Sequence, residues 1–246
     1  MEEIKSLSRG LKILKIMADV DQSISVTALA EQLDVDKATA SRTVRTLMAH
    51  GFVEKASDGR RYQLGPELVK LSSVVIDRLQ LRETAKPYLD RLVTLTGECA
   101  HLAIYSQGQA LYIDQVESDN TLRVNVAIGH MAPLHCTALG KVLLACGNHP
   151  IPEQLEGRTP TTITSRSELL RELEQVRQQG FAVDDEEYDR GVRCIAAPIS
   201  DYRNRTIAAI GISGPAVRIG LENIDPLAQQ VLVISQELSE RFQFER

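Results

Sequence analysis

The strongest constraint on the fold of this chain lies in its first 65 residues, where three helical patterns and one hairpin pattern follow one another. Apolar residues recur with helical spacing in three segments, 4–20, 26–33 and 37–49. A tight turn at 34–37 separates the second segment from the third. Two short strand-like pieces follow, joined around Asp58-Gly59, a dipeptide that suits the positive backbone angles of a hairpin turn. This order of elements predicts a winged helix-turn-helix.

Two polar residues mark the starts of the second and third of these helices. Ser25 and Asp36 each stand directly before the first apolar residues of a helical pattern, which is the position of an N-cap. Gly51 is placed to end the third helix. These local signals agree with the apolar spacing and strengthen the helix-turn-helix prediction.

The third helix and the hairpin concentrate positive charge on an acidic chain. The chain has 28 Lys and Arg against 33 Asp and Glu, a net charge of −5, but residues 37–61 contain six basic and two acidic residues. Arg and Lys contact phosphates or guanine edges, and the short Ser and Thr side chains allow a helix to approach DNA closely. The predicted DNA-binding residues are Lys37, Thr39, Ser41, Arg42, Arg45, Arg60 and Arg61. The alternative for this three-helix core is a protein-interaction module.

The rest of the chain predicts a linker helix and a mixed domain. The winged helix is expected at 4–66 and the linker helix at 67–80, and the domain at 81–246 opens with a helix at 82–95. Strand patterns joined by short turns and interspersed with helices predict an α+β domain, with an antiparallel sheet and flanking helices. The strands are expected at 99–105, 110–116, 122–128, 181–184, 192–199 and 207–213. The remaining helices are expected at 137–146, 167–179 and 221–242.

The last two strands each have small residues on one face, because successive side chains alternate between the faces of a strand. The small residues that share a face are Cys194 and Ala196 in the first strand and Ala209, Gly211 and Ser213 in the second. If these faces coincide, they leave room for a small molecule, with Asp184, Cys194 and Ser213 as polar contacts. The helix start at 137–140 offers backbone N–H groups that suit an anion. Small residues also permit close helix-on-sheet packing, and the sequence leaves both explanations open.

The histidines and cysteines raise two further alternatives, a metal site and a thiol nucleophile. Cys99 with His101, and His135 with Cys136, match no common zinc spacing, so neither a metal nor another cofactor is expected. Pairing of Cys194 with His101 or His135 would give a thiol–imidazole pair. No local motif favours that pair, and the attached DNA-binding module indicates sensing, so we expect no catalytic residues and no enzymatic activity.

Three observations predict where the protein acts. The sequence contains no run of about 18 apolar residues, so no membrane span is predicted. The opening MEEIKSLSRG lacks the basic and then apolar pattern of a secretory signal. The four cysteines are far apart and form no dense framework, which is typical of reduced thiols. We therefore expect a cytoplasmic protein with no membrane partner.

Four segments, spread over essentially the whole chain, resemble the IclR family of bacterial transcriptional regulators. They are VTALAEQLDVDKATASRTVRTLMAHGFV (26–53), LHCTALGKVLLA (134–145), GFAVDDEEYDRGVRCIAAPI (180–199) and AAIGISGPAVR (208–218). The resemblance implies a GAF-like effector-binding domain, a homodimer or tetramer, and binding to palindromic double-stranded operator DNA. It also implies repression or activation, often of carbon-source catabolism, in response to small organic, sugar-derived or aromatic acids. The alternative is a DNA-binding protein whose GAF-like domain serves only oligomerisation.

The resemblance further implies an effector site. In relatives that bind glyoxylate or pyruvate, the ligand lies against the helix-start loop, an Asp, a Cys and two Ser on a strand. The matching positions in this sequence are Ala138, Leu139, Asp184, Cys194, Gly211 and Ser213. Gly211 replaces one serine, and Leu139 is bulkier than the small residue of those relatives, so both argue against glyoxylate and pyruvate. Gly211 is expected to make space for a larger ligand.

Overall fold

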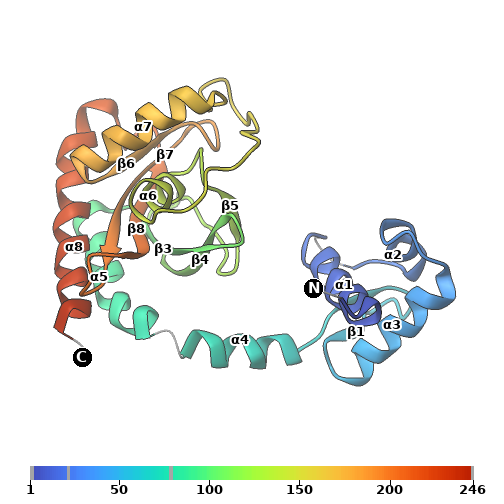
Figure 1. The fold of residues 1–246 in the computed structure, drawn as a ribbon. Helices are drawn as coiled ribbons and strands as arrows, with labels where there is room; N and C mark the ends of the chain where they lie inside the picture. Colours follow the sequence, from blue (N-terminus) through green and yellow to red (C-terminus); the bar gives the residue numbers. More distant parts are fainter. Residues whose placement is uncertain (1–2, 21–22, 78–79, 245–246) are drawn as a thin grey trace. The chain divides into compact units, whose positions relative to one another are not determined.

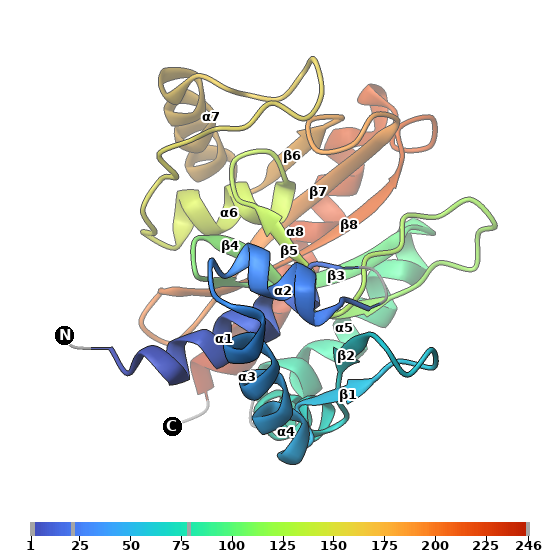
Figure 2. The same ribbon diagram turned by 90° about the vertical axis from the view of Figure 1, so that its right-hand side faces the viewer.

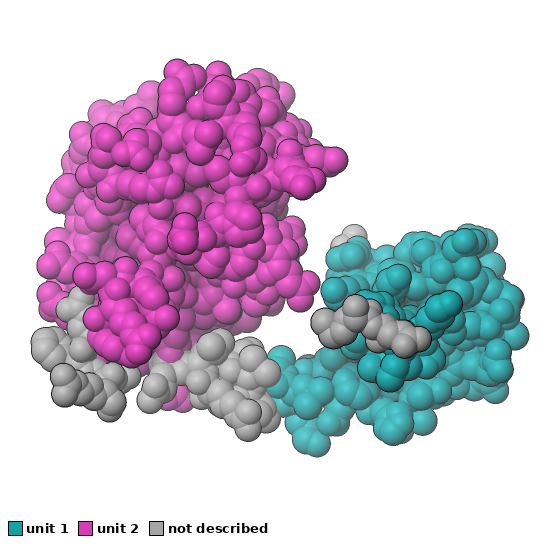
Figure 3. All heavy atoms as spheres, in the orientation of Figure 1, with its two compact units in different colours: residues 1–78 teal, residues 79–246 magenta. Residues whose placement is uncertain are grey.

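The chain divides into two compact units, residues 1–78 and residues 79–246 (Figures 1 and 3). The structure is a computed structural model that describes residues 3–20, 23–77 and 80–244. None of the helices in these ranges is long and apolar enough to cross a membrane. Residues 21–22, which follow the first predicted helix, and residues 78–79 of the predicted linker helix lie outside the described residues.

The first unit has the order of elements that the sequence predicts (Figure 1). Its elements are α1 (Lys5–Ala18), α2 (Val26–Gln32), α3 (Lys37–Ala49), β1 (Val53–Lys55), β2 (Tyr62–Leu64) and α4 (Glu67–Asp77). Both predicted N-caps form, since the Ser25 side chain accepts from the Ala28 N–H and the Asp36 side chain from the Thr39 N–H. Each cap satisfies a donor that a helix start leaves unpaired.

The core of this unit is small, and hydrogen bonds within the turn fix the hairpin beside it. Ile13, Leu29 and Val44 are completely buried where the three helices meet. At the tip of the hairpin Gly59 has a φ of +67°, a conformation that other L-residues adopt only with strain. Asp58 Oδ1 accepts hydrogen bonds from the backbone N–H groups of the two residues after the glycine, at 2.8 and 2.9 Å. These contacts give the predicted wing.

The second unit is built on one antiparallel sheet whose strand order is β5-β4-β3-β8-β7-β6. Its strands are β3 (Cys99–Ser106), β4 (Gln109–Val116), β5 (Met131–Pro133), β6 (Ala182–Asp185), β7 (Val192–Ser200) and β8 (Thr206–Pro215). Its helices are α5 (Gln80–Thr96), α6 (Ala138–Cys146), α7 (Arg166–Gln179), the 3-10 turn η1 (Leu221–Asn223) and α8 (Ile224–Phe244). The predicted α+β class is confirmed.

The helices cover both faces of the sheet and enclose two apolar cores. Helix α8 lies behind the sheet in Figure 2 and α6 in front of it. The core on the side of α5 and α8 contains the larger aliphatic residues of β7 and β8, such as Ile195 and Ile210. The core on the side of α6 and α7 contains the small residues Ala196 and Ala209. The faces of β7 and β8 that have small side chains therefore point towards α6.

The prediction of a strand at 122–128 is wrong. Leu122 and Ile128 are 63% and 44% exposed, and no sheet ladder includes this segment. Side chains hold its backbone instead, because the Val126 N–H donates to Oε1 of Gln115 at 3.3 Å and Arg218 donates to the Leu122 carbonyl. Strand β5, for which the sequence predicted no strand, occupies the sheet edge beside β4.

Candidate functional site

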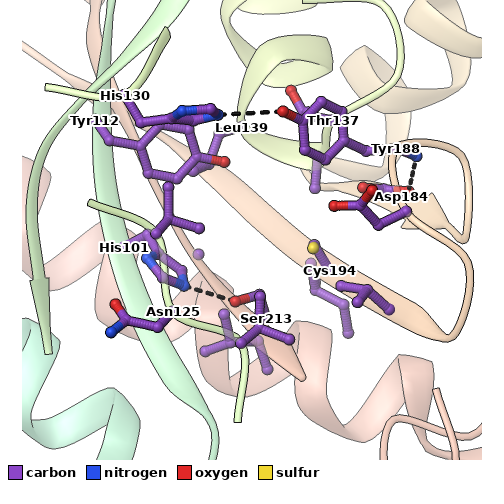
Figure 4. Close-up of a pocket in the computed structure, with 18 of the residues that line it drawn as sticks. His101, Tyr112, Asn125, His130, Thr137, Leu139, Asp184, Tyr188, Cys194 and Ser213 are labelled. Carbon is purple, nitrogen blue, oxygen red and sulfur yellow. Dashed lines mark hydrogen bonds between the residues drawn. The ribbon is translucent and has the colours of Figure 1, made fainter. Parts of the chain in front are cut away.

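A cavity of about 240 Å³ lies between the start of α6 and the sheet, within the second unit (Figure 4). It is lined from β3, β4, β7 and β8, from the end of β6 and from the segment 124–130. The lining includes all six positions predicted for an effector, namely Ala138, Leu139, Asp184, Cys194, Gly211 and Ser213. The sheet brings three of them side by side, since Asp184 pairs with Cys194 and Cys194 pairs with Ser213 across neighbouring strands.

The start of α6 offers backbone donors to this cavity. Thr137 is the N-cap, and its hydroxyl accepts from the Gly140 N–H at 3.1 Å while donating to the Pro133 carbonyl at 2.8 Å. The first two helical residues, Ala138 and Leu139, line the cavity, and a helix leaves the N–H groups of its first turn without intrahelical partners. The site therefore combines donors with the positive end of a helix dipole, which favours an anion.

Asp184 is the buried acid of the cavity, and its surroundings favour the protonated carboxyl. The residue is 1% exposed, and its Oδ1 accepts from the N–H groups of Glu187 at 2.8 Å and Tyr188 at 3.3 Å. Burial raises the pKa of Asp184 to about 7, against the lowering effect of these two hydrogen bonds. Near neutral pH this carboxyl is therefore protonated in a large fraction of molecules and can donate a hydrogen bond.

A buried ion cluster joins the start of α6 to α7 and to the loop that follows Asp184. Lys141 is 1% exposed, and its Nζ lies 2.6 Å from Oε1 of Glu187 and 2.8 Å from Oε1 of Glu172 on α7. The attraction of the two carboxylates outweighs burial and raises the pKa of Lys141. The charge of this lysine is therefore held by partners and does not face the cavity.

Further polar groups line the cavity (Figure 4). His101 Nε2 lies 2.6 Å from Ser213 Oγ, and His130 Nε2 lies 3.1 Å from the Tyr188 hydroxyl. Tyr112 stands edge-on to His101, with ring centroids 5.7 Å apart. Burial lowers the pKa of His101 to about 4, so its ring is neutral at physiological pH.

The first unit presents its predicted DNA-binding residues mainly to solvent. Lys37, Arg42 and Arg45 are exposed on α3, and Arg42 lies opposite the buried side of that helix. Thr39 is half-buried, and its hydroxyl donates to Asp36 Oδ2 at 2.7 Å. The same hydroxyl oxygen accepts a hydrogen bond from Arg42 Nη2 at 3.4 Å. The remaining members of the predicted set are the half-buried Ser41 and the exposed hairpin residues Arg60 and Arg61.

Comparison with protein families assigns both units. The model of the IclR helix-turn-helix domain matches residues 6–57, and that of the bacterial transcriptional regulator IclR C-terminal domain matches residues 73–240. The chain belongs to the IclR family. It is a transcriptional regulator of the IclR type, with a helix-turn-helix domain followed by a ligand-binding domain.

Individual relatives cover almost the whole of this IclR family chain. It is 33% identical to the HTH-type transcriptional regulator XynR of Escherichia coli, over 97% of this chain and 98% of the relative. It is 36% identical to the glycerol operon regulatory protein of Streptomyces coelicolor, over 88% of this chain and 87% of the relative. The crystal structure of Thermotoga maritima IclR aligns with a TM-score of 0.73 at 30% identity, covering 98% of this chain and 100% of that one. The Escherichia coli and Streptomyces coelicolor relatives are named as regulators.

The contacts of this regulator give no support to the thiol–imidazole pair that the sequence left open. His101 uses Nε2 on Ser213, and His135 uses Nε2 on the Glu156 carbonyl at 3.0 Å. Burial raises the pKa of the Cys194 thiol well above its usual value, which disfavours the thiolate. Within the described ranges, no group of three or more His, Cys, Asp or Glu side chains is placed to hold a metal ion.

Gly211 differs from its expected role. A Cβ atom at this position would lie 2.3 Å from the Ile195 carbonyl oxygen and 2.8 Å from the Ala196 Cβ, both on β7. The glycine therefore permits the close approach of β7 and β8, and packing explains it better than space for a larger ligand. For the small residues as a whole, both explanations apply, since the same faces pack against α6 and line the cavity.

The sequence analysis missed six polar residues of the cavity, which are His101, Tyr112, Asn125, His130, Tyr188 and Asp189. Alternation within β3 puts His101 on one face of its strand. Only the pairing of β3 with β8 puts that face beside Ser213. The segment around Asn125 was assigned to a strand, and that error removed it from consideration.

Proposed function

We propose that this IclR family regulator binds operator DNA in the cytoplasm and controls a catabolic operon in response to a small organic, sugar-derived or aromatic acid. The observation that carries the proposal is that one cavity is lined by all six predicted effector residues, two of which begin α6. The glycerol operon regulatory protein, 36% identical to this chain, is named for a carbon-source operon. Action as a repressor and action as an activator are both compatible with these features.

The polarity of the cavity favours an acid in one orientation. The described residues that line it include no Lys or Arg, so a carboxylate would be held by the N–H groups of Ala138 and Leu139 and by the helix dipole. Asp184 would donate its proton to the bound carboxylate, and Ser213 and Cys194 would fix the neighbouring atoms. The apolar body of Leu139 would contact the carbon skeleton. This arrangement resembles a typical small-molecule site, with a few convergent polar groups on apolar walls.

On the DNA side, α3 would enter the major groove. Thr39, Ser41 and Arg42 would contact base edges, since short hydroxyl side chains beside an arginine allow close approach and donation to guanine. The remaining basic residues, Lys37, Arg45, Arg60 and Arg61, would lie nearer the phosphates.

A homodimer, or a tetramer made of dimers, is proposed as the active form. Helix α1 and its N-cap residue form an apolar stripe at Ile4, Leu7 and Leu11, which are 69%, 60% and 54% exposed. Single exposed aliphatic side chains are ordinary, but three in helical register on one short helix are typical of a contact surface. Effector binding would act by favouring one arrangement of paired winged helices, which requires different effector affinities in the two states.

The first test is a fluorescence-anisotropy titration of the full chain against DNA from upstream of its own gene, with a random duplex as control and salt varied. Preference for the upstream DNA, with affinity that falls as salt rises, is the expected result. A panel of organic, sugar and aromatic acids is then added to the complex. At least one acid should change the affinity for the upstream DNA.

The Ser213→Ala variant links the effect to the cavity. It removes only a hydroxyl, so the response to the acid should be lost while the affinity for DNA stays unchanged. Loss of both would indicate misfolding. If saturating acids neither shift the melting temperature nor change DNA affinity while operator binding is intact, the second unit serves only oligomerisation and the effector proposal is wrong.

A further inference from the structure

Two consecutive residues of β4, Asp114 and Gln115, face opposite sides of the sheet. Gln115 pairs with His101, which lines the cavity, whereas Asp114 pairs with Leu102, which belongs to the core on the side of α5 and α8. Cross-strand partners share a face of a sheet. Gln115 therefore lies on the cavity side of β4, and Asp114 lies on the α5 side.

A β-bulge makes this arrangement possible. Ala103 of β3 pairs with Tyr112, but the residue before it pairs with Asp114, so Ile113 is an extra residue between the two pairs. Without it Tyr112 and Asp114 would share one face, because side chains alternate along a strand. With it Tyr112 lines the cavity, while Asp114 turns towards α5. One short piece of β4 thus contacts both the cavity and the helix that opens the second unit.

The Gln115 side chain holds one wall of the cavity. Residues 124–127 line the cavity but form neither helix nor strand. The Gln115 amide uses both of its ends on this segment, because Nε2 donates to Asn125 Oδ1 at 2.8 Å and Oε1 accepts from the Val126 N–H at 3.3 Å. A bound molecule that displaces this wall would therefore change the contacts of Gln115.

Asp114 and the Gln115 carbonyl hold the first turns of α5. Asp114 is 2% exposed, and its Oδ2 lies 3.2 Å from Nε of Arg82. Its Oδ1 accepts from the Gln115 N–H at 2.9 Å and lies 4.0 Å from Nζ of Lys86. The same Nζ donates to the Gln115 carbonyl at 3.2 Å. A buried carboxylate is costly without cations, so these contacts fix the start of α5 against β4.

Helix α5 is the first element of the second unit after the helix-turn-helix unit. Helix α4 ends at Asp77, and α5 begins at Gln80. The contacts of Gln115 and Asp114 therefore form a continuous series from the cavity wall to the place where the chain enters the second unit. Coupling between sites is carried by packed and hydrogen-bonded elements whose parts change position together.

We propose that Asp114 and Gln115 are positioning residues that transmit the state of the cavity wall to α5, and through α5 to the DNA-binding unit. Gln115 sets the position of residues 124–127 and Asp114 that of the α5 start, so a change at one end alters the other through their shared backbone. The inference rests on the proposed function, because it takes the cavity as the site of regulation. Neither residue is among those that line the cavity, so the response is assigned to residues that need not contact the effector.

Hydrogen–deuterium exchange of the full chain tests this link without any effector. Asp114→Asn keeps the shape of the side chain and an acceptor for the Gln115 N–H, but it removes the charge that attracts Arg82 and Lys86. We expect the amides of residues 84–89 on α5 to exchange about threefold faster or more. The hydrogen-bonded amides of Val126, Gly129 and His130 should accelerate as well, although the substitution is on the other face of the sheet.

Gln115→Leu tests the link from the cavity end. It removes both contacts of the amide with the wall and leaves the Gln115 carbonyl for Lys86. Exchange should again rise at both ends, because coupling is reciprocal. Arg91→Gln is the matched control, since it breaks an exposed ion pair of the same helix, with Glu237 on α8. It should leave the exchange of Val126 unchanged.

Anisotropy titrations of the same variants with the upstream DNA extend the test to the first unit. Asp114→Asn and Gln115→Leu should each change the affinity about threefold or more, whereas Arg91→Gln should not. The amides of α7 serve as the reference for global unfolding, which would accelerate all of them. If Asp114→Asn accelerates exchange in α7 as well, Lys86→Met, which removes only a half-exposed partner, replaces it with the same expectation.

The outcomes distinguish this inference from the proposed function. Exchange that rises only beside the substituted residue would overturn the link and leave DNA and effector binding standing. Faster exchange at both ends with unchanged DNA affinity would overturn the transmission to the DNA-binding unit. If the unaltered protein shows no preference for the upstream DNA, the proposed function fails, and exchange at the two ends still decides whether the cavity wall and α5 are linked.

Discussion

The charged side chains singled out in the two units of this regulator differ in their exposure to solvent. On α3 of the first unit, Lys37, Arg42 and Arg45 are exposed to solvent. In the second unit, Lys141 and Asp184 are each 1% exposed and are surrounded by hydrogen-bonding partners. An exposed cation is available to a polyanion that approaches from solution, whereas Asp184 can contact only a molecule that enters the cavity, and Lys141 contacts only its carboxylate partners. The comparison shows how one chain can serve two ligands of very different size.

The difference also separates stability from binding. Replacing an exposed charge far from other features changes stability little, whereas removing one member of a buried ion pair leaves the other charge without compensation. Mutations in the first unit should therefore alter DNA affinity, and mutations of the buried groups should alter the fold. Four predictions test this contrast.

The largest effect is expected for Lys141→Met. The variant leaves Glu187 and Glu172 without their cation, and breaking a buried ion pair typically costs about 3–5 kcal/mol. A urea titration followed by circular dichroism measures the free energy of unfolding of the second unit. Lys37→Met on α3 is the matched control and should change stability by less than about 0.5 kcal/mol. Similar losses in the two variants would contradict the contrast between the units.

The Asp184→Asn variant should be stabilised relative to the unaltered protein as pH rises. Burial raises the pKa of Asp184 from 3.8 to about 7, so the stability that this group contributes is present below 3.8 and is lost as pH rises through 7. The Asn side chain stays neutral, and its Oδ1 can still accept from the backbone. Between pH 5 and pH 8 the stability of the variant relative to the unaltered protein should increase by about 1–3 kcal/mol.

Thermal unfolding at the two pH values measures this effect. Asp189→Asn provides the control, because it removes the same charge from an exposed position close by. A pH-independent difference between Asp184→Asn and the unaltered protein would show that the folded-state pKa of Asp184 is not raised.

Arg42→Ala should weaken binding to the operator by about 1–3 kcal/mol if Arg42 contacts a base. Its exposure opposite the buried side of α3 predicts little change in stability. Anisotropy titrations with the upstream DNA and a random duplex measure the two affinities. Arg171→Ala on α7 removes the same charge from an exposed position of the second unit and serves as control. An equal loss on both DNAs would identify a phosphate contact instead.

The smallest effect is expected for Arg61→Ala at the hairpin. A phosphate contact there carries no sequence information, so binding to the upstream and random DNAs should weaken equally. The slope of log affinity against log salt should decrease in magnitude by about one. A loss confined to the upstream DNA would instead assign base recognition to the hairpin.

The fold of the first unit could be predicted because its determinants are local. Ser25, Asp36 and Gly59 act within a few residues of their own positions, and the apolar spacing of a helix needs no partner to be recognised. The second unit was predicted well where strands alternate clearly, as in β7 and β8. It was mispredicted at 122–128, where an alternating segment is held by the side chains of Gln115 and Arg218 instead of a ladder.

The candidate site shows the same division. The six residues assigned by family resemblance all line one cavity, but His101 and Tyr112 enter it through the order of the strands. Strand β3 is separated from β8 by about a hundred residues, and no local pattern predicts that they are neighbours. The buried cluster around Lys141 was missed for a related reason, since its carboxylate partners lie on α7 and on the loop after β6.

The two outer strands of the sheet have a consequence for assembly. Strand β5 spans only three residues and ends in Pro133, which has no backbone N–H, and strand β6 at the opposite edge spans four residues. Short edges and edge prolines give a second molecule little backbone with which to extend a ladder, a device that protects β-proteins from uncontrolled aggregation. Growth of the sheet from copy to copy is therefore disfavoured at both ends. Association would have to proceed through helices, where side chains instead of backbone groups decide which partner fits.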